Sequence, residues 1–127
     1  MHAREARFMA DLYAPQQPDA IARLFQVLGE WTQTNGAKGC FFLKAWGEYA
    51  ERDATLAGQA LAFRTTLRHY IRDCVTAVQG KENLLLSDAI WMLFEGAITS
   101  ALIIGNAAAD QAGTIASQLL QPQGAAE

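Results

Sequence analysis

The sequence predicts an all-helical protein, a bundle of about five to six helices. Apolar residues recur at three- and four-residue spacing in the periodic segments, and no stretch alternates apolar and polar residues as a half-buried strand does. Apolar residues make up 51% of the 127 residues and charged residues 18%, a composition typical of a packed globule. A chain of this length can bury one core without disulfides or metal.

Turn residues divide the first half of the chain into segments of helical length. The first segment, about residues 2–13, is too short and too polar to fold alone, so we expect it to lean on the rest of the chain. The second begins with Asp19 as its N-cap and ends at Asn35-Gly36. Aromatic residues at helical spacing then predict a short helix over residues 40–49.

A long helix is predicted over about residues 54–79, with Gly80 as its terminator. Its apolar stripe faces the core, and its outer positions include Arg64, Arg68 and Arg72, four residues apart. We interpret this basic ridge as an ordinary solvated face and not as an anion site.

The next helix, about residues 83–104, is apolar on nearly every side and must therefore be covered on every side. Sister helices in so small a domain can cover one face, so the other face needs a second subunit or a membrane. Its longest apolar stretch, residues 89–104, is broken by Glu95 and falls short of the ~20 residues of a membrane span, so we expect burial in protein. A last amphipathic helix is predicted over residues 107–120, and its apolar stripe is Ala108, Ala112, Ile115 and Leu119.

Charge and cysteine content exclude several classes of function. A net charge of −3 argues against a surface that neutralises phosphates, so direct nucleic-acid binding is not expected. Cys40 and Cys74 have neither the spacing nor the histidine partners of a zinc site and are expected to be buried in a reducing cytosol. The N-terminus carries acids and no apolar core of signal-peptide length, so we expect a cytoplasmic protein. No cofactor is expected.

The sequence does not favour an enzyme. The histidines are His2, which is terminal, and His69, which we expect at the surface or in packing, and no nucleophile stands beside a base. Glu95 is the most informative acid, because an unpaired carboxylate in an apolar helix is energetically unfavourable. We expect it to form a salt bridge or a helix-end contact near the subunit seam, with direct contact to a ligand as the alternative.

Two short motifs carry a resemblance to a known family. Residues 39–48 read GCFFLKAWGE and resemble the Gly-Cys-x-Phe-Leu-x-x-x-x-Glu signature in the C-terminal domain of many TetR/AcrR transcription regulators. Residues 93–97, LFEGA, resemble the acidic-Gly-small motif of that family's dimerisation helix. The match covers roughly residues 19–120, most of the chain.

The resemblance implies a bundle whose last two helices pair with those of a second subunit, while the preceding helices enclose a pocket for a small apolar or aromatic effector. Residues 1–14 would be the remnant of a connecting helix, residues 15–121 the effector-binding and dimerisation domain, and residues 122–127 a tail. The family carries a helix-turn-helix module of about fifty residues ahead of this region. Nothing here supplies that module, so DNA would be reached only through a part absent from this chain.

The apolar stripes of the predicted helices, together with the resemblance, predict two sets of functional residues. The expected pocket, for which a dry packed core is the alternative, is lined by Trp31, Phe42, Trp46, Phe63, Leu67, Tyr70, Trp91, Phe94 and Glu95. The expected dimer interface contains Met92, Gly96, Ser100, Ala101, Ile103, Ala108, Ala112, Ile115 and Leu119. The alternative function is a stand-alone helical scaffold or adaptor that binds a different protein through the same apolar helix.

Overall fold

The structure, a computed structural model, describes residues 3–35 and 54–121. Within those ranges every regular element is a helix, so the prediction of an all-helical chain is confirmed for them. The helices are α1 (Ala3–Ala10), α2 (Ala20–Asn35), α4 (Ala54–Gln79), α5 (Leu84–Ile104) and α6 (Ala107–Leu120). The short helix expected over residues 40–49 lies outside the described residues.

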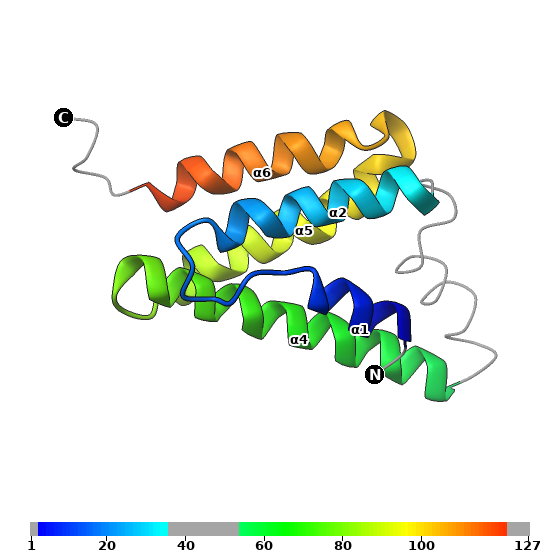
Figure 1. The fold of residues 1–127 in the computed structure, drawn as a ribbon, viewed down its shortest axis with the longest axis horizontal. Coiled ribbons are helices and arrows are strands. Elements are labelled where there is room, and N and C mark those ends of the chain that lie inside the picture. Colours follow the sequence, from blue (N-terminus) through cyan, green and yellow to red (C-terminus); the bar gives the residue numbers. More distant parts are fainter. Residues whose placement is uncertain (1–2, 36–53, 122–127) are drawn as a thin grey trace.

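The four longer helices form a bundle in which each packs against its neighbour. The closest pairs are α2 with α6, α6 with α5, and α5 with α4 (Figure 1). Short turns at residues 80–83 and 105–106 make α4, α5 and α6 successive antiparallel neighbours. The shorter α1 lies beside the bundle, where its Phe8 reaches aromatic rings of α2, α4 and α5.

The residues at the helix ends have conformations and hydrogen bonds that explain where the helices begin and end. Gly80 and Gly105 adopt φ values of 78° and 68°, a left-handed conformation that favours glycine. Asn83 caps α5: its side-chain oxygen accepts the backbone N–H of Leu86 at 3.1 Å. Asp19 stands at the start of α2, where its carbonyl accepts the N–H of Arg23 at 3.0 Å.

Small residues set the packing of α6 and correct the predicted stripe of that helix. The buried face is Ala108, Ala109, Ala112 and Ala116, and it lets α2 and α5 approach closely. At Gly113 a Cβ would lie 2.9 Å from the Cβ of Phe25, so α2 and α6 leave no room for a side chain there.

The larger apolar residues of α6 point outward as a result. Ile115 and Leu119 are 45% and 44% exposed, although the sequence pattern placed them on one stripe with Ala108 and Ala112. Two neighbours bury the alanine face of α6, and the branched side chains remain on the opposite side.

Candidate functional site

Six of the residues expected in the pocket belong to the hydrophobic core cluster or pack against it. Phe63, Leu67 and Phe94 are at most 2% exposed. The ring that joins the aromatic members is Phe8, whose centroid lies 5.8 Å from that of Phe63 and 6.1 Å from that of Phe94. Trp31 lies at the edge of the same cluster, 5.5 Å from Phe8. These residues form a filled core around Phe8.

Phe8 is the residue that the sequence reasoning did not place in the cluster. The first segment was expected to lean on the rest of the chain, and Phe8, which is fully buried, is one of the side chains by which it does so. A large aromatic residue in a segment too short to fold alone was the available signal, since such a helix needs a strong anchor. Phe42 and Trp46, also expected in the pocket, lie outside the described residues.

The hydroxyl of Tyr70 is hydrogen-bonded within the chain. Its hydroxyl donates a hydrogen bond to the backbone carbonyl of Tyr13, which ties the segment after α1 to α4. Burial raises the pKa of Tyr70 above its usual value, so the hydroxyl stays protonated and remains a donor. Cys74, one turn further along α4, is 1% exposed, and burial raises its pKa to about 11, so its thiolate form is suppressed at neutral pH.

The basic ridge of α4 is not a free solvated face, and that interpretation is corrected here. Arg68 makes two hydrogen bonds of 2.8 Å to the carboxylate of Asp88, and its guanidinium carbon lies 5.6 Å from the ring centroid of Trp91. Arg64 pairs with Glu95 at 3.4 Å. Since α4 and α5 run antiparallel from the turn at residues 80–83, the ridge meets the acids of α5 in register. The salt bridge expected for Glu95 is therefore present within one chain.

The pKa values of Asp88 and Glu95, the two acids at the α4–α5 contact, are shifted in opposite directions. The hydrogen bonds from Arg68 lower the pKa of Asp88. Burial raises the pKa of Glu95, and the attraction of Arg64 opposes that rise only in part. Within the described residues, Glu95 Oε2 and Trp91 Nε1 are buried without a hydrogen-bond partner. The folded chain therefore binds a proton at Glu95 more readily than the unfolded chain does.

Glu95→Gln is expected to stabilise the fold at pH 7, because glutamine removes the charge whose burial raises the pKa of Glu95. A raised folded pKa means that stability falls as pH rises from the ordinary glutamate value through the folded value. Glutamine mimics the protonated acid, so the gain should shrink as pH is lowered from 7 toward 4.5. Urea unfolding of both proteins across this range measures it. A variant that is less stable than the parent by the same amount at every pH would contradict the expectation.

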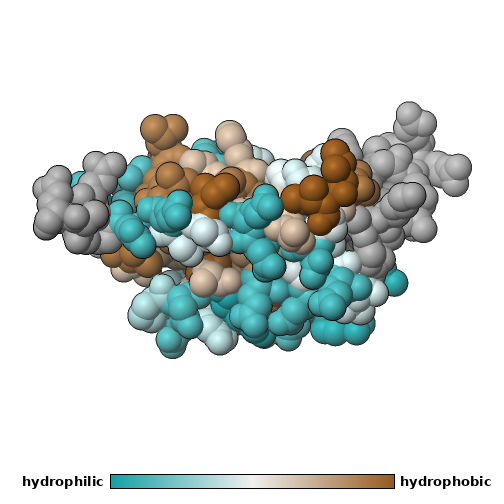
Figure 2. All heavy atoms as spheres, turned by 90° about the horizontal axis from the view of Figure 1, so that it is seen from above, coloured by the Kyte–Doolittle hydropathy of each residue, from teal (hydrophilic) through white to brown (hydrophobic). Residues whose placement is uncertain are grey.

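An exposed apolar stripe, interrupted by Thr99 and Ser100, runs along the outer side of α5. Leu85, Met92 and Ile103 are 86%, 62% and 88% exposed, and Gly96 lies between the last two. A Cβ built on Gly96 would have no neighbour within 4 Å among the described residues. In Figure 2, which views the molecule from the α6 side, apolar side chains gather along one half of the surface and hydrophilic ones along the other.

A groove of about 230 Å³ between α5 and α6 adjoins this stripe. Six of the nine residues expected at the dimer interface line it: Met92, Gly96, Ser100, Ala108, Ala112 and Ile115. Ala101 is 4% exposed and packs inside the subunit, so its placement at the surface is corrected. Ala108 and Ala112 are also nearly buried and form the floor of the groove rather than its rim. Ile103 and Leu119 lie exposed beyond it.

The apolar helix is longer than the stretch considered from the sequence. Because Leu84, Leu85 and Leu86 begin α5, the helix spans 21 residues, and among the described residues it is long and apolar enough to cross a membrane by length and composition. A third of that stretch is buried in the protein, including Ile90 and Phe94. Core helices of soluble proteins share this length and composition.

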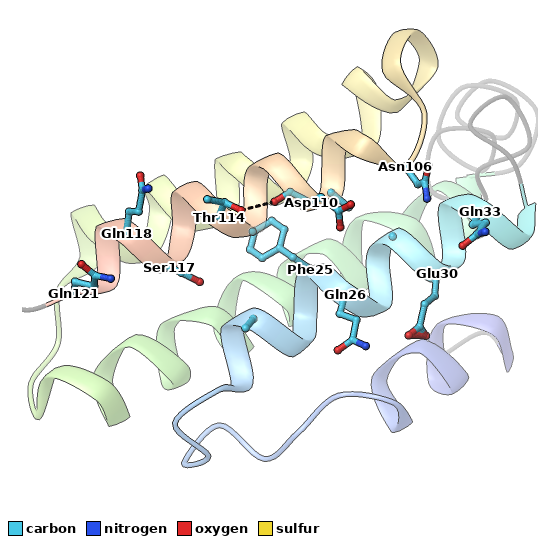
Figure 3. A pocket seen from close by; sticks show the side chains of 14 residues that line it. Phe25, Gln26, Glu30, Gln33, Asn106, Asp110, Thr114, Ser117, Gln118 and Gln121 are labelled. Carbon is cyan, nitrogen blue, oxygen red and sulfur yellow. Dashed lines mark hydrogen bonds between the residues drawn. The ribbon is translucent and has the colours of Figure 1, made fainter.

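A groove of about 620 Å³ lies between α2 and α6, with many polar side chains around it (Figure 3). The sequence reasoning did not anticipate it, because its rim comes from polar positions of two helices far apart in the chain. The rim residues include Gln26, Glu30, Gln33, Asp110, Thr114, Ser117, Gln118 and Gln121. Across residues 3–35 and 54–121, no three histidine, cysteine or acidic side chains are grouped closely enough to hold a metal ion.

No family model, curated protein or solved structure matches this chain.

Proposed function

We propose that this chain is the effector-sensing and dimerisation domain of a TetR-type transcription regulator, and that it pairs with a second copy through α5 and α6. The observation that carries the proposal is the apolar stripe of α5 with Gly96 in it. In this arrangement DNA is contacted through a separate helix-turn-helix module and not through this bundle, the effector is small and apolar or aromatic, and the protein works in the cytoplasm.

Gly96 supports a helix as the occupant of this face. Glycine inside a helix is less favourable than alanine by about 1 kcal/mol. Inside the described subunit nothing needs the space at Gly96, whereas the space at Gly113 is taken up by Phe25. A second helix crossing at Gly96 would use it, since small residues allow two backbones to approach closely.

The surroundings of the stripe support a protein interface with a polar rim. On one side lie the ion pairs Arg64–Glu95 and Arg68–Asp88, and on the other side lies the α5–α6 groove flanked by Ile115. An apolar centre bordered by charged residues is typical of subunit interfaces. Because the same face is offered by every copy, a two-fold arrangement would cover it in both subunits at once.

Sedimentation velocity and equilibrium measurements test the pairing. We expect a particle of twice 13.8 kDa at micromolar concentration, because permanent homodimers commonly bury more than ~2,000 Å² of apolar surface. A monomer at that concentration would refute the dimer and favour the adaptor alternative, in which another protein covers α5.

A flotation assay with phosphatidylcholine–phosphatidylglycerol vesicles tests whether the chain binds a membrane instead of a second copy. The chain should remain in the aqueous fraction, because its apolar stripe is covered in the dimer. Flotation of the chain with the vesicles would refute the proposed pairing.

A further inference from the structure

Small residues give the groove between α2 and α6 its shape. A Cβ built on Gly29 would lie 3.5 Å from the Cβ of Ala109, and Gly113 lies directly against Phe25. These contacts set the two helices antiparallel, because residues 25 and 29 of α2 are opposite residues 113 and 109 of α6. Phe25, which lies between the helices in Figure 3, and Ala109 are each 2% exposed and line the groove. The floor of the groove is therefore apolar.

The sides of the groove carry polar side chains along its length. Its uncharged polar residues are Gln26, Gln33, Asn106, Thr114, Ser117, Gln118 and Gln121. Carboxamide and hydroxyl oxygens accept hydrogen bonds from a ligand. The lining residues of α2 run from position 22 to position 33, which is about 16 Å of helix at 1.5 Å per residue. The groove therefore has the shape for an extended chain.

The charges at the groove are negative. The described residues that line it include Glu30 and Asp110, and none of them is a lysine, arginine or histidine. Because Gly29 is opposite Ala109, the next residue of each helix places these two carboxylates at one level of the groove. Among the described residues no ion pair involves Asp110, and Glu30 is 3.9 Å from Arg23, at the long limit of a salt bridge.

The lining disfavours several common classes of ligand. Anions would meet two carboxylates and no positive side chain. Sugar rings and nucleobases commonly stack on an aromatic face. Phe25 is the one aromatic side chain among the described lining residues, and it is 2% exposed. A positively charged ligand with an extended aliphatic body fits both the charge and the floor.

We propose that the groove between α2 and α6 binds a linear aliphatic polyamine. Its ammonium groups donate to Asp110, Glu30 and the amide oxygens along the sides, and its methylene groups lie over Phe25 and Ala109. The site is formed within one subunit. It lies on a different side of α6 from Ile115, which lines the α5–α6 groove, so the inference goes beyond the proposed pairing and does not depend on it.

Spermidine is the probe, titrated into the full chain by calorimetry at low ionic strength. Asp110→Asn should raise its dissociation constant at least about fivefold, because the isosteric amide removes the charge that the ammonium group meets. Asp73→Asn is the matched control, since Asp73 is an exposed acid on α4 outside the groove. Equal weakening by the two variants would mean that spermidine responds to net charge alone and would overturn the proposal.

A lysine placed in the groove should compete with the ligand. Thr114→Lys sets an ammonium group one turn from Asp110 and should weaken spermidine binding at least about tenfold. Thr65→Lys is its control, because Thr65 and Thr114 are both exposed and each donates to the carbonyl one turn earlier, that of Leu61 or Asp110. Unchanged affinity in Thr114→Lys would overturn the proposal.

Nuclear magnetic resonance locates the bound ligand. Saturating spermidine should shift the amide signals of Gly29 and Gly113 and leave that of Gly58 on α4 in place. Dodecane-1,12-diol, an uncharged extended chain, should produce no such shift. Shifts confined to other helices, or equal shifts with the diol, would overturn the proposal.

Discussion

Gly96→Leu is expected to raise the dissociation constant of the dimer at least about thirtyfold. Overpacking a close contact costs about 1–3 kcal/mol for each inserted side chain, and both subunits carry the substitution. Gly96 has open space around it within the described subunit, so the new side chain disturbs nothing there. Sedimentation equilibrium over a concentration series measures the change.

The same substitution should increase the stability of the helix, so weaker association of the variant would not be explained by unfolding. Leucine favours the helix over glycine by about 0.8 kcal/mol, so the dissociated variant should resist urea better than a dissociated parent. Gly58→Leu is the matched control, because Gly58 is also a helical glycine with open space around it among the described residues. It should gain stability without changing association. Unchanged association of Gly96→Leu would remove the argument for a helix crossing at this position.

Phe94→Ala is expected to destabilise the fold by about 3–5 kcal/mol. Phe94 is fully buried and lies 6.1 Å, centroid to centroid, from both Phe8 and Phe25, so its removal leaves a cavity that three helices cannot fill. The melting temperature should fall by about 10 °C or more, measured by circular dichroism at 222 nm.

Two further variants keep that expectation testable. Phe94→Leu retains most of the volume and should lose about 1–2 kcal/mol if the alanine variant does not fold. Leu61→Ala removes an apolar side chain that is 48% exposed on α4 and should lose less than about 1 kcal/mol. Equal losses for Phe94→Ala and Leu61→Ala would mean that the aromatic cluster does not carry the core.

Much of the fold follows from local rules that the sequence states directly. The glycines at positions 80 and 105 and the asparagine at position 83 end and begin helices through the conformations and hydrogen bonds of their own neighbourhoods. The 3.6-residue repeat of apolar residues likewise indicates a helix before its neighbours are known. For the same reason the core positions of α4, such as Leu67 and Ile71, agree with the predicted stripe.

The residues that form the candidate sites are brought together by contacts between helices. Local sequence patterns do not predict those contacts. Arg68 pairs with Asp88 because the antiparallel α4–α5 hairpin places the two residues opposite each other. The buried face of α6 differs from the predicted stripe because α2 and α5 both pack against its alanine residues. Phe8 entered the core because three helices converge on it. The sequence by itself determined which of the described segments are helices and that α5 carries more apolar surface than one small bundle covers. Only the tertiary structure decided which side chains are paired, buried or left outside, because those depend on contacts between residues far apart in the chain.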